Sequence, residues 1–280
     1  MKIGVHPSNL HLRIAQVWPD AFAALDGEFV AYREGRDTGR LITEGKIDFG
    51  GTGSTPPITA ALDGLPVNYI AASAPRPANG AILVRTDSPI KSTSDLKGRR
   101  IGLVDGSFQT YYLARNLEDA QLSLTDIERI EPEVNDALPA LLDGRVDAWI
   151  AMAPRLENAL ERDDIRLLSR CGSTIPNRSL FWTVETASLS ADTRLKIAQE
   201  LARIGREITA DPHQAARRLV ESGATETNLQ GWEKVIASRD FTVIPADEII
   251  LTEQQTEAEV LHRHGHFEHL ARIYPQAASF

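Results

Sequence analysis

A hydroxyl-rich segment, residues 52–55 (Thr-Gly-Ser-Thr), directly precedes the proline pair Pro56-Pro57. Proline is favoured in the first turn of a helix, where its missing N–H would be unpaired in any case. Ser54 or Thr55 is a suitable N-cap in front of it. The free N–H groups and positive dipole end of such a helix, together with the hydroxyls, can hold an anion. A plain turn followed by a capped helix would use the same residues, so this segment alone supports both interpretations.

Three other predicted strand ends lead into turns of the same kind. These turns are His6-Pro7-Ser8-Asn9, Asp105-Gly106-Ser107-Phe108 and Met152-Ala153-Pro154. In open α/β sheets, ligands bind outside the carboxyl ends of the strands. Because the four turns are divided between two halves of the chain, they predict a ligand cleft between two lobes.

The elements that must position these turns alternate along the chain. We expect strands at residues 2–5, 28–35, 48–53, 67–73, 80–87, 99–104, 127–132, 147–154, 165–171 and, as a crossing strand, 179–185. We expect helices at residues 6–22, 37–47, 56–64, 106–122, 135–146 and 155–164. Four further helical segments follow at residues 191–212, 213–223, 226–239 and 245–265.

This alternation predicts an α/β fold with mainly parallel sheets and helices on both faces. The pattern of strand, small-residue turn and helix occurs twice. We therefore expect lobe one to comprise residues 1–85 plus 181–280 and lobe two to comprise residues 86–180. The C-terminal helices are expected to pack on lobe one.

Composition narrows the classes of partner. The formal net charge of -9 argues against a nucleic-acid surface, but a local site can still bind a small anion. The one cysteine, Cys171, excludes an intrachain disulfide and a cysteine zinc cluster. We expect no metal, no cofactor and no membrane-spanning segment. No signal peptide is recognisable, so either a leader was removed or the protein stays in the cytoplasm.

Four segments carry a resemblance to a known family: "EGKIDFGGTGSTPPITA", "AILVRTDSPIKSTSDLKGRRIGLVDGSFQTYYL", "LLDGRVDAWIAMAP" and "FTVIPADEIILTEQQ". They resemble solute-binding proteins of the nitrate, sulfonate and taurine class, most strongly the aliphatic-sulfonate-binding branch, in order and over nearly the whole chain. The resemblance implies a two-lobed periplasmic-binding-protein-like fold of the double-crossing type, with a ligand cleft between the lobes. It further implies a periplasmic monomer that binds a small organic anion and delivers it to an ABC permease.

The resemblance also implies which residues bind the ligand. By position, the anion is held from lobe one by Ser8, Asn9, Thr52, Gly53, Ser54 and Thr55, and from lobe two by Gly106, Ser107, Phe108 and Gln109. Met152 and Pro154 would line the cleft, and His6 and Arg155 are further candidates beside it. An aromatic residue is common in the family where Met152 stands, and an acidic one where Ser54 stands. The identity of the anion therefore stays open.

Two alternatives belong to other classes: an enzyme on the same fold (a desulfinase, a lyase or a thiamin-precursor synthase) and a cytoplasmic ligand sensor. The desulfinases need a cysteine after the first strand and an Arg-x-Gly-Gly motif, where this chain has His6 and Asp48-Phe49-Gly50-Gly51. Without a thiolate nucleophile at that position we expect no catalysis. Cys171 is interpreted as a buried structural residue. The histidines of "HRHGHFEH" (His262, His264, His266 and His269) are interpreted as a solvated helix end rather than a metal site.

Overall fold

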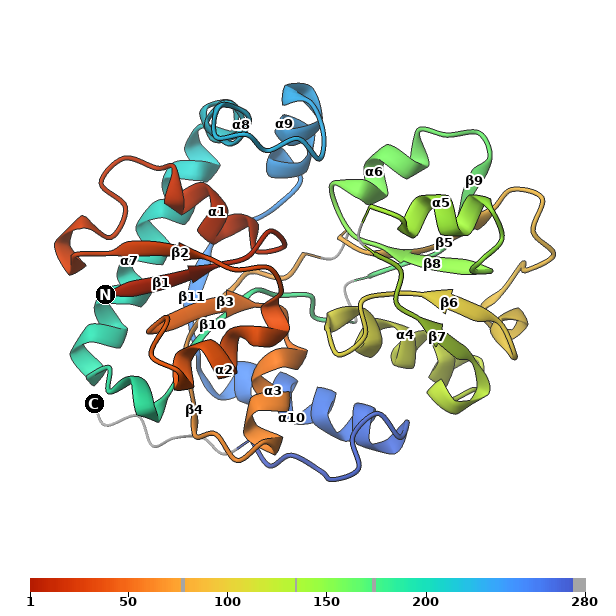
Figure 1. Ribbon diagram of the computed structural model, residues 1–280, viewed down its shortest axis with the longest axis horizontal. Coiled ribbons are helices and arrows are strands. Elements are labelled where there is room, and N and C mark those ends of the chain that lie inside the picture. Colours follow the sequence, from red (N-terminus) through yellow and green to blue (C-terminus); the bar gives the residue numbers. More distant parts are fainter. Residues whose placement is uncertain (77–78, 134, 173–174, 274–280) are drawn as a thin grey trace. The chain divides into compact units, whose positions relative to one another are not determined.

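The computed structural model describes residues 1–76, 79–133, 135–172 and 175–273. The chain forms two compact units (Figure 1). Unit 1 contains Met1–Pro75, Arg178–Thr256 and the chain from Ala271, and unit 2 contains Arg76–Asn177 and Glu257–Leu270. Each unit has its own sheet and its own core, so each is described by itself.

Unit 1 is built on a six-stranded sheet with the order β11-β4-β10-β3-β1-β2. Its strands are β1 (Lys2–Val5), β2 (Glu28–Ala31), β3 (Phe49–Thr52), β4 (Val67–Ser73), β10 (Leu180–Val184) and β11 (Val243–Pro245). Strands β2 and β3 pair in parallel with β1, whereas β10 runs antiparallel between β3 and β4. The crossing strand predicted at residues 179–185 is therefore confirmed as β10.

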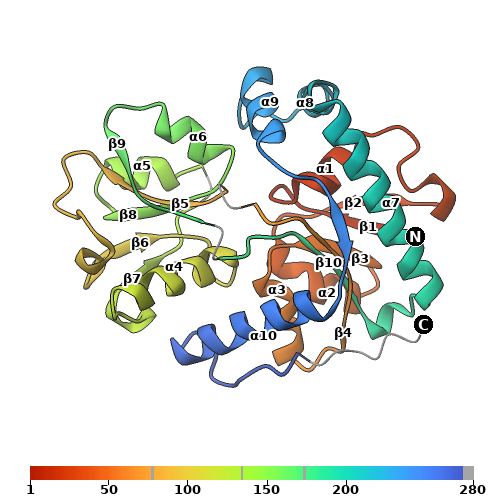
Figure 2. The same ribbon diagram turned by 180° about the vertical axis from the view of Figure 1, so that it is seen from behind.

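Alternate residues of β10 face opposite sides of this sheet, as the period of a strand requires. Leu180, Trp182 and Val184 pack in one core cluster with residues of α2 and α3. Phe181 contacts His11 of α1, and the His11 ring is hydrogen-bonded to the Leu201 carbonyl of α7. Helices thus cover both faces: Figure 1 shows α2 and α3 on the near side of the sheet, and Figure 2 shows α7 on the other.

The helices of unit 1 include α1 (Leu10–Gln16), α2 (Thr38–Thr43), α3 (Thr55–Leu62), α7 (Ala191–Ala210), α8 (Pro212–Glu221) and α9 (Leu229–Ala237). A further helix, α10 (Glu248–Arg263), belongs to unit 1 up to Thr256 and to unit 2 beyond it. The four helical segments predicted after residue 190 are confirmed as α7 to α10. Short 3-10 helices lie at Ala23–Leu25, Gly35–Asp37, Thr93–Leu96, Leu124–Asp126 and Glu185–Ala187.

Unit 2 has a five-stranded sheet with the order β7-β6-β8-β5-β9. Its elements are β5 (Ala81–Arg85), β6 (Arg100–Gly102), α4 (Phe108–Asp119), β7 (Glu128–Ile130), α5 (Ala137–Leu142), β8 (Ala148–Ala151), α6 (Arg155–Leu160) and β9 (Ile165–Arg170). Strands β6, β7 and β8 are parallel, and β5 is antiparallel to β8 and β9. Both sheets are therefore mixed. The predicted α/β class is confirmed, but the expectation of mainly parallel sheets is wrong. Among the described residues, no helix combines the length and the apolar character needed to cross a membrane.

Candidate functional site

The predicted ligand residues of unit 1 gather at one edge of its sheet. Strands β1 and β3 pair in parallel, with Ile3 opposite Phe49 and Gly4 opposite Gly50. The segments that follow them, residues 6–9 and 53–54, therefore leave the sheet at the same edge. His6 and Asn9 come from the first segment and Ser54 from the second. We call these three residues half-site 1.

The Ser54 hydroxyl is buried and unpaired. Ser54 occupies the cap position before α3, but its side chain makes no cap hydrogen bond. An N-cap side chain accepts from the N–H of the second or third helical residue, and here these residues are Pro56 and Pro57, which have no N–H. The residue is 5% exposed, and its Oγ has no hydrogen-bond partner within the described chain. The predicted N-cap role is therefore wrong for Ser54, and its hydroxyl stays available.

Asn9 presents a second unpaired donor. Its Oδ1 caps α1 by accepting from the Leu12 N–H at 3.0 Å, while its Nδ2 has no partner among residues the structure describes. The side chain is only 1% exposed. An amide donor buried in this way costs about 1–3 kcal/mol unless a ligand or water pairs with it. A Cβ on Gly51 would lie 2.4 Å from Asn9 Nδ2, so a glycine at position 51 leaves the amide its space.

His6 is a neutral histidine with a defined tautomer. Its Nε2 lies 2.9 Å from the Gly51 carbonyl oxygen, which can only accept, so Nε2 carries the proton. Burial is the largest cause that lowers the pKa of His6 to about 4, and Arg13 adds a smaller lowering effect. The ring is uncharged at neutral pH, and its Nδ1 carries a lone pair.

The remaining lobe-one candidates differ in their surroundings. The Thr52 hydroxyl donates to the Gly53 carbonyl at 2.7 Å and accepts from Trp182 Nε1 at 2.9 Å. Thr55 is fully buried as the first residue of α3, whereas Ser8 is exposed. Thr52 therefore fixes the course of the segment after β3, and the ligand roles of Ser8, Thr52, Gly53 and Thr55 stay predictions.

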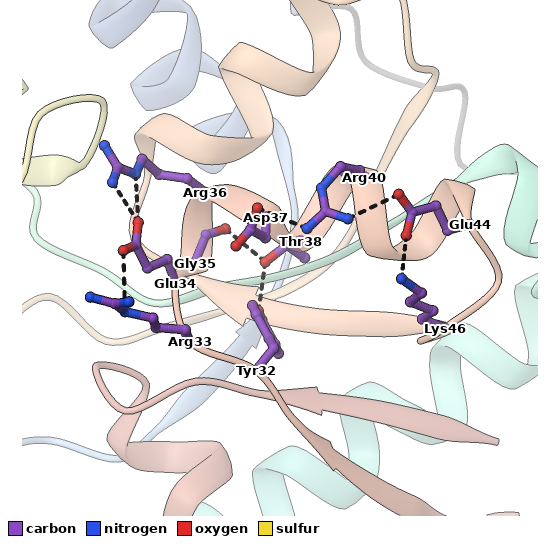
Figure 3. Close-up of polar contacts among 10 residues, drawn as sticks. All are labelled: Tyr32, Arg33, Glu34, Gly35, Arg36, Asp37, Thr38, Arg40, Glu44 and Lys46. Atoms are coloured by element: carbon purple, nitrogen blue, oxygen red, sulfur yellow. Dashed lines mark hydrogen bonds and ion pairs between the residues drawn. The ribbon is translucent and has the colours of Figure 1, made fainter.

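A segment that the sequence interpretation missed packs against His6. A Cβ on Gly35 would lie 3.1 Å from His6 Nε2, so this glycine allows the close approach. Thr38 Oγ1 donates to the Gly35 carbonyl at 2.8 Å, and the Tyr32 hydroxyl lies 2.6 Å from Thr38 Oγ1 (Figure 3). No motif or spacing marks Tyr32 and Gly35 in the sequence, because the contact depends on the pairing of β1 with β2.

Ion pairs surround this segment on its solvent side (Figure 3). Arg40 pairs with Asp37 at 3.0 Å and with Glu44 at 2.9 Å, and Lys46 pairs with Glu44 at 2.8 Å. Arg36 pairs with Glu34. Exposed pairs of this kind contribute little to stability, so the segment is held mainly by the Tyr32–Thr38–Gly35 contacts.

The predicted residues of unit 2 also share one sheet edge, since β6 is parallel to β8 and β7. After β6, Ser107 caps α4 by accepting from the Gln109 N–H at 3.2 Å and donates to the Val104 carbonyl at 2.6 Å. Gln109 Oε1 accepts from the Val104 N–H at 2.9 Å. Gly106 has a φ of 70°, in the left-handed region that favours glycine. We call Gly106, Ser107 and Gln109 half-site 2.

A cluster of charged residues that was not predicted from the sequence stabilises the turn of half-site 2. Asp105 accepts from the Gly106 N–H at 3.1 Å and from Thr110 Oγ1 at 2.8 Å. Arg129 Nη1 lies 2.9 and 3.0 Å from the two Asp105 oxygens and 3.0 Å from His266 Nδ1. Burial is the largest cause that lowers the pKa of His266. The turn after β6 is thus tied to β7 and to the segment after α10.

The other lobe-two candidates line different parts of unit 2. Phe108 is buried against Tyr111 and Tyr112, so it is a core residue of α4. Met152 is half-buried, and its sulfur packs closely on Gly80, where an added Cβ would lie only 3.1 Å from it. Pro154 is buried after a cis peptide bond, and Arg155 Nη2 donates to Asn135 Oδ1 at 3.4 Å.

Two further interpretations can be compared with the structure. Cys171 is buried, as predicted, and burial raises the pKa of its thiol to about 11, so it is not a reactive thiolate. The solvated interpretation is wrong for His264, which is 5% exposed with Nε2 3.4 Å from Glu118 Oε1, and for His266. Within the described ranges, no group of three or more histidine, cysteine or acidic side chains could hold a metal ion.

These two mixed-sheet units, each with small polar residues at the carboxyl ends of parallel strands, define the fold class of two-lobed periplasmic binding proteins. Solved structures confirm that class. The periplasmic aliphatic sulphonate binding protein SsuA of Escherichia coli superposes with a TM-score of 0.84 at 24% identity, covering 98% of this chain and 90% of the other. The alkanesulfonate-binding protein SsuA of Xanthomonas axonopodis pv. citri, bound to MOPS, gives 0.88 at 22% identity, covering 98% and 96%.

The chain belongs to the NMT1/THI5-like family, which matches residues 22–169. A protein of Escherichia coli (strain K12) named as an aliphatic sulfonates-binding protein is 32% identical over 166 residues, which are 59% of this chain and 51% of that protein. The chain spans about half the length of the sulfonates-binding relatives it matches. The fold also occurs in a desulfurization enzyme, at a TM-score of 0.67, 13% identity and coverage of 98% and 94%.

Proposed function

We propose that this protein is a solute-binding protein, without catalytic activity, that captures a small organic anion of the sulfonate type and delivers it to an ABC importer. Family membership and the sulfonates-binding relatives support this class of function over an enzyme or a sensor. Cys171 belongs to unit 2, and the high pKa of its thiol also gives no support to desulfinase chemistry.

One observation carries the proposal: half-site 1 holds two buried polar groups that pair with no residue in the described part of the chain. These are the amide nitrogen of Asn9 and the hydroxyl of Ser54. Buried polar groups are normally paired, and each exception calls for a reason. A ligand oxygen that accepts from Asn9 Nδ2 and Ser54 Oγ would recover the free energy that their burial costs.

The electrostatics of half-site 1 suit a small anion. The side chains of Asn9 and Ser54 are uncharged donors, and the N-terminus of α3 lies beside Ser54. Pro56 and Pro57 have no N–H, so the favourable field at this end of α3 comes from the helix dipole rather than from N–H groups of these two residues. A sulfonate has three acceptor oxygens that share one negative charge, which matches several neutral donors better than one cation.

The second half of the proposed site is half-site 2 of unit 2, with Met152 and Pro154 beside it. In this proposal the anion contacts both units, and the closed form is favoured by contacts that only that form can make. An ABC permease would recognise the closed form. We also propose that the protein acts in the periplasm as a monomer.

A thermal-shift screen of the full chain tests this function. The ligands are ethanesulfonate, taurine, nitrate, sulfate and bicarbonate, each titrated over several orders of magnitude. A ligand present at 100 times its Kd stabilises the native state by about 2.7 kcal/mol, so the melting temperature should rise steadily with sulfonate concentration. After incubation, the sulfonate should be recovered intact. Release of sulfite or sulfate would show an enzyme instead, and no shift with any anion would contradict the proposal.

A further inference from the structure

His6 contributes a hydrogen-bond acceptor to half-site 1, in contrast to the donors of Asn9 and Ser54. Its Nε2 proton is engaged by the Gly51 carbonyl at 2.9 Å. In a neutral imidazole the other nitrogen is then an acceptor. His6 Nδ1 has no hydrogen-bond partner among residues with a described position.

The His6 ring and the Asn9 amide both lie against Gly51. The His6 ring is bonded to the carbonyl of Gly51, and the Asn9 amide occupies the space where a Cβ of the same residue would stand. The His6 carbonyl also accepts from the Asn9 N–H at 3.1 Å. The two side chains therefore flank one residue of β3.

A second segment lies against the Nε2–Cε1 edge of the ring. Gly35 lies against the ring edge, and its carbonyl is fixed by Thr38, whose hydroxyl meets that of Tyr32 (Figure 3). The Tyr32 and His6 ring centroids are 5.5 Å apart. Because the pKa of His6 lies near 4, the acceptor persists at neutral pH.

From this geometry we propose that half-site 1 selects anions that carry a hydrogen-bond donor, such as a hydroxyl, next to the anionic group. His6 Nδ1 accepts from that donor while Asn9 and Ser54 donate to the anionic oxygens. A sulfonate oxygen placed at Nδ1 would meet a lone pair, so His6 also fixes which end of the ligand binds where. This selectivity rests on the proposed anion-binding function.

Two sulfonates that differ by one hydroxyl test the selectivity: ethanesulfonate and 2-hydroxyethanesulfonate, titrated calorimetrically into the full chain at pH 7.5. The wild type should bind the hydroxylated anion about three- to tenfold more tightly, the effect of one neutral hydrogen bond. His6→Gln keeps a side-chain N–H that can reach the Gly51 carbonyl but has no acceptor at the Nδ1 position. It should bind both anions with equal affinity.

The matched variant is His6→Asn, which places an amide oxygen at the Nδ1 position and gives up the bond to Gly51. It should retain a preference for the hydroxylated anion. Equal affinities in the wild type, or a preference that persists in His6→Gln, would overturn the inference and leave the anion-binding function standing. Failure of the wild type to bind either anion would contradict both.

Discussion

Removal of the Ser54 hydroxyl should change binding and stability in opposite directions. In Ser54→Ala, the free protein loses a buried hydroxyl that has no partner in the described chain. Because a buried unpaired polar group costs about 1–3 kcal/mol, the free energy of unfolding should rise by about 1 kcal/mol. The complex loses a hydrogen bond to a charged group, worth about 1.5–3 kcal/mol, so the Kd for ethanesulfonate should rise about 10- to 150-fold.

The assay pairs urea unfolding of the free protein with calorimetric titration of ethanesulfonate. Thr183→Val is the matched control, since Thr183 is also buried in unit 1 but donates to the Asp48 carbonyl at 2.6 Å. The control should lose about 1–3 kcal/mol of stability and bind ethanesulfonate normally. An unchanged Kd in Ser54→Ala would remove this hydroxyl from the site. A loss of stability like that of Thr183→Val would show that the hydroxyl has a structural partner.

Three further predictions concern the surroundings of the two half-sites. The pKa of His6 is lowered from 6.5 to about 4, so below pH 6.5 the unfolded chain binds a proton at this residue more readily than the folded chain does. The free energy of unfolding should therefore fall by about 3 kcal/mol between pH 6.5 and pH 4. Urea unfolding across this range should show a smaller loss in His6→Gln, and equal losses would contradict a buried neutral ring. Gly51→Ala puts a Cβ 2.4 Å from Asn9 Nδ2 and 2.9 Å from Phe181, so it should cost about 1–3 kcal/mol and weaken ethanesulfonate binding. Gly172→Ala, where a Cβ meets no atom of the described residues within 4 Å, is its control, and equal effects of both would contradict the close approach. Asp105→Asn weakens the ion pair with Arg129, so amide hydrogen exchange should accelerate at Gly106–Thr110 and around His266. Unchanged exchange in both segments would show that this ion pair does not hold the turn after β6 in place.

The fold could be predicted largely from local patterns. The spacing of apolar residues predicts the alternation of strands and helices. The segment "SLFWTVE" could be recognised as the crossing strand β10 because its large residues point alternately to the two faces of the sheet. Strand β11 was missed because it has three residues and ends at Pro245, which is too short for a period to show. The place of β5 between β8 and β9 depends on long-range pairing, which local spacing does not encode.

The candidate site was predictable only in part. The sequence Ser54-Thr55-Pro56-Pro57 already contains the reason that Ser54 cannot cap its helix, because prolines occupy the positions that would donate. The unpaired amide of Asn9 depends on the space left by Gly51, 42 residues later, and no motif marks that pair. The cluster of Asp105, Arg129 and His266 joins three distant segments, the last 137 residues beyond Arg129. For the same reason His264 and His266 were wrongly interpreted as solvated.

The measurement that tests the central claim most directly is a calorimetric titration of ethanesulfonate into the full chain and into Asn9→Asp. This substitution keeps an oxygen that can cap α1 and replaces the unpaired Nδ2 donor by a carboxylate oxygen that repels an anion. The wild type should show one saturable site, and Asn9→Asp should show none while it unfolds cooperatively. Equal affinities for ethanesulfonate in the two proteins would contradict the assignment of the anion to half-site 1.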